Sequence, residues 1–214
     1  MTLKWILITV LIILLAGFAA WGPIVSNVER PDYDIMMSQG SIEVREYTPL
    51  LVAEVQTTGD RDQAISKGFR KLADFIFGNN IKTSEIAMTA PVSQQPADGK
   101  SEKIPMTAPV SQQEAGENTW HVRFVMPSKY TMETLPKPEN DEIEIKKQPA
   151  KTYAAIQFSG LKSKANIKKH EKQLADFLEG NNLTPQSAPI YAFYNPPWTL
   201  PFLRRNEVMV EVER

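Results

Sequence analysis

Two segments of the chain place hydrophobic residues three and four positions apart, which is the spacing of one face of an α-helix. The two stripes consist of Ile65, Phe69, Leu72 and Ile76, and of Ile167, His170, Leu174, Phe177 and Leu178. Asp60 or Asp62 is the expected N-cap of the first helix, because a short acidic side chain can accept a free backbone N–H. Gly78 and Gly180 are the expected ends of the two helices. The pattern therefore predicts two long amphipathic helices.

Other segments alternate between hydrophobic and polar residues. Every second position is hydrophobic in two clear runs, one with Trp120, Val122, Phe124 and Met126 and the other with Val208, Val210 and Val212. In the first run, His121 and Arg123 share the other face, which we expect to be the solvent side. Half-buried alternation is typical of an antiparallel sheet with one covered face. Strands with only two long helices predict the α+β class.

The chain contains one unit twice, with an offset of 101 or 102 residues. Ile42-Glu43-Val44 corresponds to Ile143-Glu144-Ile145, and Leu72-Ala73-Asp74-Phe75 corresponds to Leu174-Ala175-Asp176-Phe177. Two copies are too few for a solenoid. We therefore expect one domain over residues 41–213, in which pseudo-twofold repeats of about 41–138 and 139–213 share a core.

A shorter repeat lies inside the first unit. Met88-Thr89-Ala90-Pro91-Val92-Ser93-Gln94-Gln95 recurs as Met106 to Gln113, with a turn-rich polar stretch between the copies. This arrangement favours a hairpin whose arms carry the same sequence. The proline in each arm favours an edge position or a bulge, because proline cannot donate to a strand ladder.

The first 25 residues differ from the rest. Trp5 to Val25 has Thr9 as its one clearly polar side chain, and its length matches a bilayer core when helical. Lys4 favours a cytoplasmic N-terminus, so we expect an inner-membrane signal anchor at 1–25, a linker at 26–40 and an extracytoplasmic, periplasmic domain. A secretory signal peptide cleaved after Ala19 is the alternative.

Composition and charge exclude several classes of protein. The 214 residues include no Cys, which excludes disulfide frameworks and thiolate chemistry. A formal net charge of −1 argues against a nucleic-acid binder that works by basic charge. No phosphate-binding loop, HExxH or G-x-S-x-G motif is present. The sequence therefore gives no reason to expect an enzyme.

The aromatic C-terminal segment completes a resemblance to a known family. Tyr194-Asn195-Pro196-Pro197 and Arg204-Arg205-Asn206-Glu207-Val208, with the doubled Met-Thr-Ala-Pro-Val, resemble the SOUL heme-binding proteins, and in particular their bacterial branch. The resemblance implies a distorted antiparallel β-barrel flanked by two helices. It also implies non-catalytic binding of heme or a related tetrapyrrole in a cleft between the first helix and the C-terminal loop.

Carried over by position, the resemblance gives two walls for this cleft. The helix wall would comprise Ile65, Ser66, Phe69, Leu72 and Ala73, and the loop wall Tyr194, Trp198, Leu200 and Phe202. In animal members of the family, cationic side chains stand at the position of Ser66 and near that of Thr199. In this chain, Lys67, Arg70 or Arg204 could supply the missing positive charge.

The resemblance does not assign the role of axial iron ligand to either of the two histidines, His121 and His170. From the residues alone, His170 is either an iron ligand or a boundary residue packed on the sheet, as its lysine neighbours favour. Two functions remain open, namely a heme carrier or buffer held at the membrane by its N-terminal helix, and a module for another flat apolar ligand or a protein partner.

Overall fold

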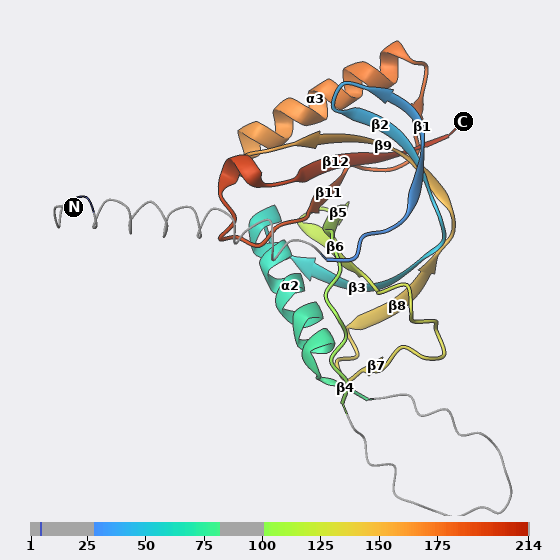
Figure 1. Ribbon diagram of the computed structural model, residues 1–214, viewed down its shortest axis with the longest axis vertical. Coiled ribbons are helices and arrows are strands. Elements are labelled where there is room, and N and C mark those ends of the chain that lie inside the picture. Colours follow the sequence, from blue (N-terminus) through green and yellow to red (C-terminus); the bar gives the residue numbers. More distant parts are fainter. Residues whose placement is uncertain (1–4, 6–27, 82–100, 214) are drawn as a thin grey trace, which may run out of the picture.

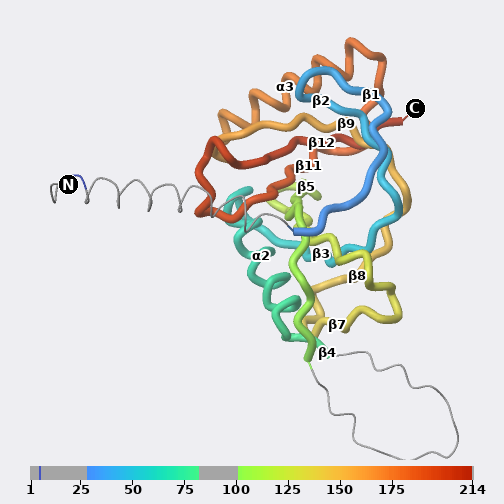
Figure 2. Tube along the Cα trace, in the orientation of Figure 1, coloured from blue at the N-terminus to red at the C-terminus, as the bar shows by residue number. Residues whose placement is uncertain are grey.

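The computed structural model describes Trp5 and residues 28–81 and 101–213. Within these residues, ten strands form one curled antiparallel sheet, and two further strands form a separate pair (Figures 1 and 2). The large sheet contains β1 (Tyr33–Gln39), β2 (Ile42–Tyr47), β3 (Leu50–Thr58), β5 (Val110–Gly116), β6 (Thr119–Val125), β8 (Ile143–Gln148), β9 (Lys151–Phe158), β10 (Thr184–Pro185), β11 (Ile190–Phe193) and β12 (Asn206–Glu213). The small pair contains β4 (Asn80–Ile81) and β7 (Lys137–Pro138).

The order of the strands follows the duplication in the sequence. The main path runs β1-β2-β9-β12-β11-β5-β6-β3-β8. The two repeats make β2 the counterpart of β8, β3 of β9, β5 of β11 and β6 of β12. When each strand is exchanged for its counterpart, the path without β1 has the same order read from the opposite end. The path ends at β1 and β8, so the distorted barrel that the family resemblance implies is a curled half-barrel.

The two predicted helices are present on the outer side of the curl (Figure 1). Helix α2 (Arg61–Phe77) packs on β3 and β6, and α3 (Lys164–Gly180) packs on β9 and β12. Asp60, one of two candidates, is the N-cap of α2 and accepts the Gln63 N–H at 2.9 Å. Gly78 ends α2 with a φ of 128°, which favours glycine. Gly180 is the last residue of α3, as predicted, and Asn181 is the C-cap.

Three hydrophobic clusters fill the fold, and both faces of the sheet are covered. One cluster lies between α2 and the sheet and a second between α3 and the sheet. A third, which we call the inner cluster, consists of Tyr47, Ala108, Ala155, Ile190, Ala192, Tyr194 and Met209. The expectation of one covered face is therefore wrong, because the curl encloses the face opposite the helices.

Several predicted boundaries also differ from the structure. Strand β1 lies in the segment expected to be a linker and pairs with β2. The second copy of the short repeat leads into β5, which lies between β6 and β11 rather than at an edge, with Pro109 just before the strand begins. The first copy lies outside the described residues.

The predicted membrane helix also falls on residues that the structure does not describe, except for Trp5. Among the described residues, none of the helices has the length and apolar character needed to cross a bilayer.

Candidate functional site

The predicted helix wall on α2 is mostly buried. Ile65 and Leu72 belong to the cluster beneath α2, and Ala73 is buried as well. Phe69 is 38% exposed, and its ring packs edge-on against Phe124 of β6 with centroids 5.4 Å apart. Of the four hydrophobic residues predicted for this wall, Phe69 alone presents substantial surface to a ligand.

The polar residues of α2 lie on a different side of the helix. Ser66 is exposed and donates to the Asp62 carbonyl at 2.7 Å. It lines a hollow of about 440 Å³ together with Lys67, Arg70 and other polar or charged residues. Lys67 donates to the Thr58 carbonyl at 3.0 Å. This hollow has no aromatic lining, so it is a poor match for a flat apolar ligand.

Tyr194, predicted for the loop wall, lies in the inner cluster instead. Its hydroxyl donates to Glu207 at 2.6 Å, and the same carboxylate accepts from Arg45 at 3.0 Å and from Arg205 at 2.7 Å. Burial alone would raise the pKa of Glu207, but the hydrogen bond and charge of Arg45, together with the charge of Arg205, hold it below its usual value. Tyr194 is therefore part of a buried ionic network and does not face Phe69.

A second ionic network lies on the sheet around Glu54 of β3. Its carboxylate pairs with Arg123 and accepts from Lys146 at 2.6 Å, and His121 Nδ1 lies 3.2 Å away. Burial would raise the pKa of Glu54, and the cations of Lys146 and Arg123 lower it overall. His121 and Arg123 therefore face a buried carboxylate, which corrects the expectation that they face solvent.

The rest of the predicted loop wall is at least partly exposed. Trp198 is 54% exposed and Phe202 is 69% exposed, whereas Leu200 is half-buried. Arg204 donates to the carbonyls of Thr199 at 2.7 Å and Pro197 at 2.5 Å, which fixes the loop. The segment ends in the short helix η1 (Pro201–Leu203), which lies next to the start of α3 (Figure 1).

Two backbone carbonyls attach this loop to the segment before α3. The Gly160 N–H donates to the Pro201 carbonyl at 2.8 Å, and the Asn206 side chain donates to the Gly160 carbonyl at 3.1 Å. The structure thus brings Phe202 and Arg204 to α3, the helix of the second repeat.

An open cavity of about 730 Å³ lies between α3 and this loop, and we call it the α3 cavity. Its aromatic lining comes from Phe158, Phe202 and His170, and its cations from Lys169, Arg204 and Arg205. No Asp or Glu is among the described residues that line it, and the lining is more polar than apolar. Volumes of about 300–1,000 Å³ are usual for small-molecule sites. The cavity therefore offers positive charge and the exposed ring of Phe202, but less apolar surface than small-molecule sites usually have.

His170 is held in a defined orientation at this cavity. Its ring stacks on Phe158 of β9 with centroids 4.0 Å apart and an interplanar angle of 11°. Nδ1 lies 2.7 Å from the Asn166 carbonyl oxygen, one helical turn earlier. Packing on the sheet was one of the two sequence interpretations of His170, and the contact with the α3 cavity adds to it.

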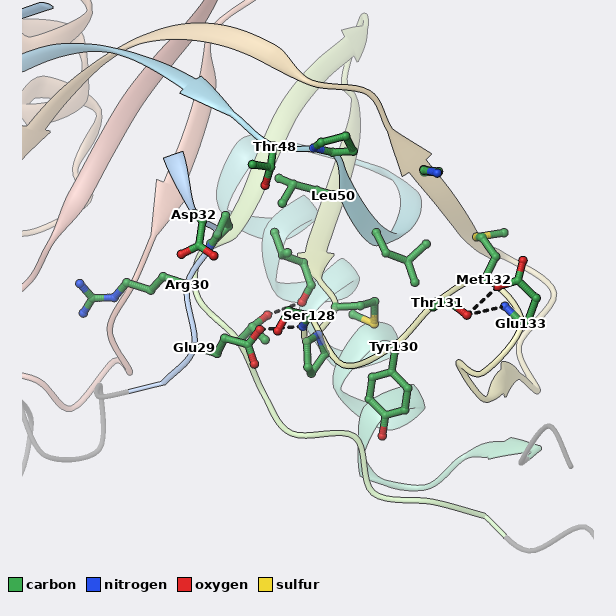
Figure 3. Close-up of a pocket in the computed structure, with 18 residues that line it drawn as sticks. Glu29, Arg30, Asp32, Thr48, Leu50, Ser128, Tyr130, Thr131, Met132 and Glu133 are labelled. Carbon is green, nitrogen blue, oxygen red and sulfur yellow. Dashed lines mark hydrogen bonds between the residues drawn. The ribbon is translucent and has the colours of Figure 1, made fainter. Parts of the chain in front are cut away.

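A second cavity, of about 430 Å³, lies at the end of β3 and β6 (Figure 3). Leu50, Met126, Tyr130 and Met132 contribute to its lining, as does Glu29, whose carboxylate accepts the Ser128 N–H at 2.6 Å. None of the predicted site residues lines it. Sequence patterns alone do not predict this cavity, because residues 29–32 fall in the segment expected to be a linker.

An α+β half-barrel with an open cavity of this kind defines a domain suited to bind a small ligand. The sequence model described as "SOUL heme-binding protein" matches residues 28–101 and 95–211. The chain therefore belongs to the SOUL family, as the C-terminal motif predicts.

Proteins named for heme binding are among its relatives. The chain is 30% identical over 187 residues to human heme-binding protein 2, covering 85% of this chain and 84% of that protein. It is 28% identical over 149 residues to pig heme-binding protein 1, covering 69% of this chain and 70% of that protein.

Solved structures of low sequence identity share the fold. The C-terminal domain of EcmrR superimposes with a TM-score of 0.55 at 12% identity, covering 85% of this chain and 98% of that chain. A Listeria innocua protein described as a hydrolase gives 0.55 at 16% identity, covering 83% and 94%. These likenesses support the half-barrel architecture and nothing about the ligand.

Proposed function

We propose that this protein binds heme or a related tetrapyrrole and catalyses no reaction, so that it acts as a carrier or buffer. Membership of the SOUL family and the names of the relatives carry the proposal of this ligand class. The α3 cavity adds the exposed ring of Phe202 and several cations, with no described carboxylate in its lining.

The exposed ring and the cations of this lining match two features of the ligand. A heme has a flat apolar macrocycle and two propionates, so it requires aromatic surface on one side and positive charge at one edge. Phe202 can pack on the macrocycle, and Lys169 and Arg204 can pair with the propionates. When bound, the heme would supply an iron centre and its visible spectrum.

The lining also favours binding over catalysis. General acid–base chemistry needs titratable groups placed against the reacting atoms. No described carboxylate lines the α3 cavity, and His170 is the one described histidine in its lining. A non-catalytic role is therefore the simpler function for this cavity.

A spectral titration of the full chain with hemin tests the proposal. We expect a saturable shift of the Soret band with one heme per chain. Phe202→Ala should weaken hemin binding several-fold, whereas Phe77→Ala, a control that also removes an exposed ring but from the end of α2, should not. If the wild type shows no saturable binding, the proposal is wrong, and the module for another flat ligand or a protein partner takes its place.

We further propose that the domain lies at the extracytoplasmic face of the inner membrane. The apolar stretch Trp5 to Val25 and the single positive charge before it support this placement. A reporter enzyme fused after Arg214 should be active only outside the cytoplasm, and activity inside would contradict the placement. The mass of the mature chain decides between an anchor and cleavage after Ala19.

A further inference from the structure

We infer that one end of the domain docks on the surface of an anionic lipid bilayer. This end, which we call the basic tip, consists of residues 159–170 and 195–206, where the C-terminal loop and η1 lie beside the start of α3 (Figure 1). The inference goes beyond heme binding. It uses the proposed membrane placement only to bring lipid close to the tip.

The basic tip exposes four large hydrophobic side chains. They are Leu161 (56% exposed), Trp198 (54%), Phe202 (69%) and Leu203 (39%). The hydrogen bond from the Gly160 N–H to the Pro201 carbonyl joins the two segments that carry them. Leu161 and Trp198 do not line the α3 cavity, so the proposed heme site gives no reason for their exposure. Exposed apolar side chains that gather at one place mark an interaction surface.

Positive charge surrounds these hydrophobic side chains. The two segments contain no Asp or Glu and six cationic residues, namely Lys162, Lys164, Lys168, Lys169, Arg204 and Arg205. Arg205 is paired with Glu207. Two other carboxylates, Asp60 and Asp62 at the start of α2, line a hollow together with Lys164, and Asp62 also pairs with Arg61 at 3.4 Å. The remaining cations of the tip outnumber these carboxylates, so the tip attracts anionic headgroups.

The loop of the tip has few backbone polar groups that need water. Arg204 donates to the carbonyls of Thr199 and Pro197. The N–H groups of Thr199 and Leu203 donate to carbonyls of the same loop at 3.1 Å and 2.9 Å. Three of its residues are proline, which has no N–H. Because unpaired backbone groups are costly in lipid, this pairing lowers the cost of placing the loop in a bilayer interface.

Lipid fits the tip better than a protein partner does. Trp, Phe and Leu beside Lys and Arg are typical of surfaces that lie in the headgroup region of a bilayer. The apolar stretch from Trp5 ends at Val25, and the five residues from there to Arg30 span at most about 18 Å. Arg30 lies over the ring of Tyr194, directly before the loop, at 5.7 Å from the centroid. A chain held in the bilayer up to Val25 would therefore keep this side of the domain near lipid.

The test attaches the fluorophore NBD to single cysteines of the full chain in lipid vesicles. The chain has no Cys, so Trp198→Cys provides one attachment point. In vesicles of mixed phosphatidylcholine and phosphatidylglycerol, emission of this label should rise several-fold, and a nitroxide on the lipid acyl chain should quench it.

Phe77→Cys is the matched control, because it also replaces an exposed ring. Arg61 donates to the Lys162 carbonyl at 2.8 Å, so α2 begins at the tip. Phe77, at the other end of α2, lies about 24 Å further along the helix axis. Its label should therefore be quenched little.

A second pair of variants tests the charge. Lys164→Gln with Lys168→Gln should reduce the quenching of the label at residue 198 by at least half, as should high salt, because both weaken attraction to anionic headgroups. Lys103→Gln with Lys137→Gln removes two exposed lysines outside the tip and should leave the quenching unchanged. Vesicles of phosphatidylcholine alone should quench the label less than the anionic vesicles do.

Lack of lipid quenching at residue 198 in anionic vesicles would overturn the inference, whether or not the chain sediments with the vesicles. Equal quenching at residues 198 and 77 would overturn it too, because contact with lipid would then not be specific to the tip. A label that lipid does not quench, but that high protein concentration shields from iodide, would assign the surface to a second copy of the chain instead.

These outcomes are independent of the proposed function. The vesicle experiment contains no heme, so its failure leaves the hemin titration as the test of the ligand. If a carbonate wash releases the chain from vesicles that had quenched the label, the proposed anchor is wrong while the inference holds.

Discussion

Phe69→Ala measures how much of the exposed ring on α2 serves the fold. Phe69 is 38% exposed and packs edge-on against Phe124. Replacing a fully buried Phe by Ala costs about 3–5 kcal/mol, and scaling this range by the buried fraction gives about 2–3 kcal/mol. Of this, about 0.5–1.5 kcal/mol belongs to the aromatic pair.

Urea unfolding of the full chain, followed by far-ultraviolet circular dichroism, gives the free energy of unfolding. Leu72→Ala is the matched control on the same helix, because Leu72 is fully buried. We expect it to cost about 3–5 kcal/mol, in the upper part of the range for buried Leu. A cost for Phe69→Ala below about 1 kcal/mol would refute the reasoning, since it would show that the contact with Phe124 contributes nothing.

The same variant separates the two candidate heme walls. If heme lies in the α3 cavity, Phe69→Ala should leave hemin affinity unchanged once the protein is shown to be folded. A loss of hemin affinity in folded Phe69→Ala, with Phe202→Ala unaffected, would place the ligand on α2 instead.

Four further substitutions test the fold, and one of them is combined with Val122→Ala. Glu207→Gln should lower the free energy of unfolding at pH 7 by about 3–5 kcal/mol, because two buried guanidinium groups lose their counter-charge. The pKa of Glu207 is lower in the folded than in the unfolded state. Its carboxylate therefore stabilises the fold above the unfolded pKa of about 4.3, and this stabilisation is lost as the pH falls through the folded pKa. The free energies of unfolding of wild type and variant should therefore converge in acid. Asp60→Ala and Ser163→Ala should each cost about 1 kcal/mol in urea unfolding, since each removes an N-cap hydrogen bond. Gly68→Ala should cost about 1–3 kcal/mol despite its gain in helix propensity, because the added Cβ would lie 2.6 Å from Val122. Adding Val122→Ala should then cost less than the sum of the two single changes, and strict additivity would show that no clash occurs.

Much of the secondary structure was predictable because its causes are local. The stripe on α2 and its cap at Asp60 follow from residues within one or two helical turns. The strand at residues 119–125 was equally clear, with Trp120 and Phe124 buried as the alternation predicts. The internal repeat also anticipated the symmetric strand order.

The buried inner face was not predictable from local patterns. Glu207 is fully buried because Arg45, 162 positions earlier in the chain, reaches it across the curled sheet. Alternation alone assigns such a carboxylate to solvent. Only the closure of the curl, which depends on all the strands together, explains why Glu207 and Glu54 are paired inside.

The location of the C-terminal loop depends on distant contacts too. The hydrogen bond from the Gly160 N–H to the Pro201 carbonyl attaches the loop to the segment before α3. No local sequence motif predicts this hydrogen bond. The family resemblance predicts a cleft between α2 and this loop, whereas the exposed Phe202 lines the cavity beside α3, in the second repeat.

Anomalous diffraction at the iron edge, from crystals of the heme complex, tests the central claim most directly. The account predicts one iron site per chain in the α3 cavity, where Phe202 would pack on the macrocycle. An iron site beside Phe69 on α2, or in the cavity lined by Tyr130 and Met132, would contradict it.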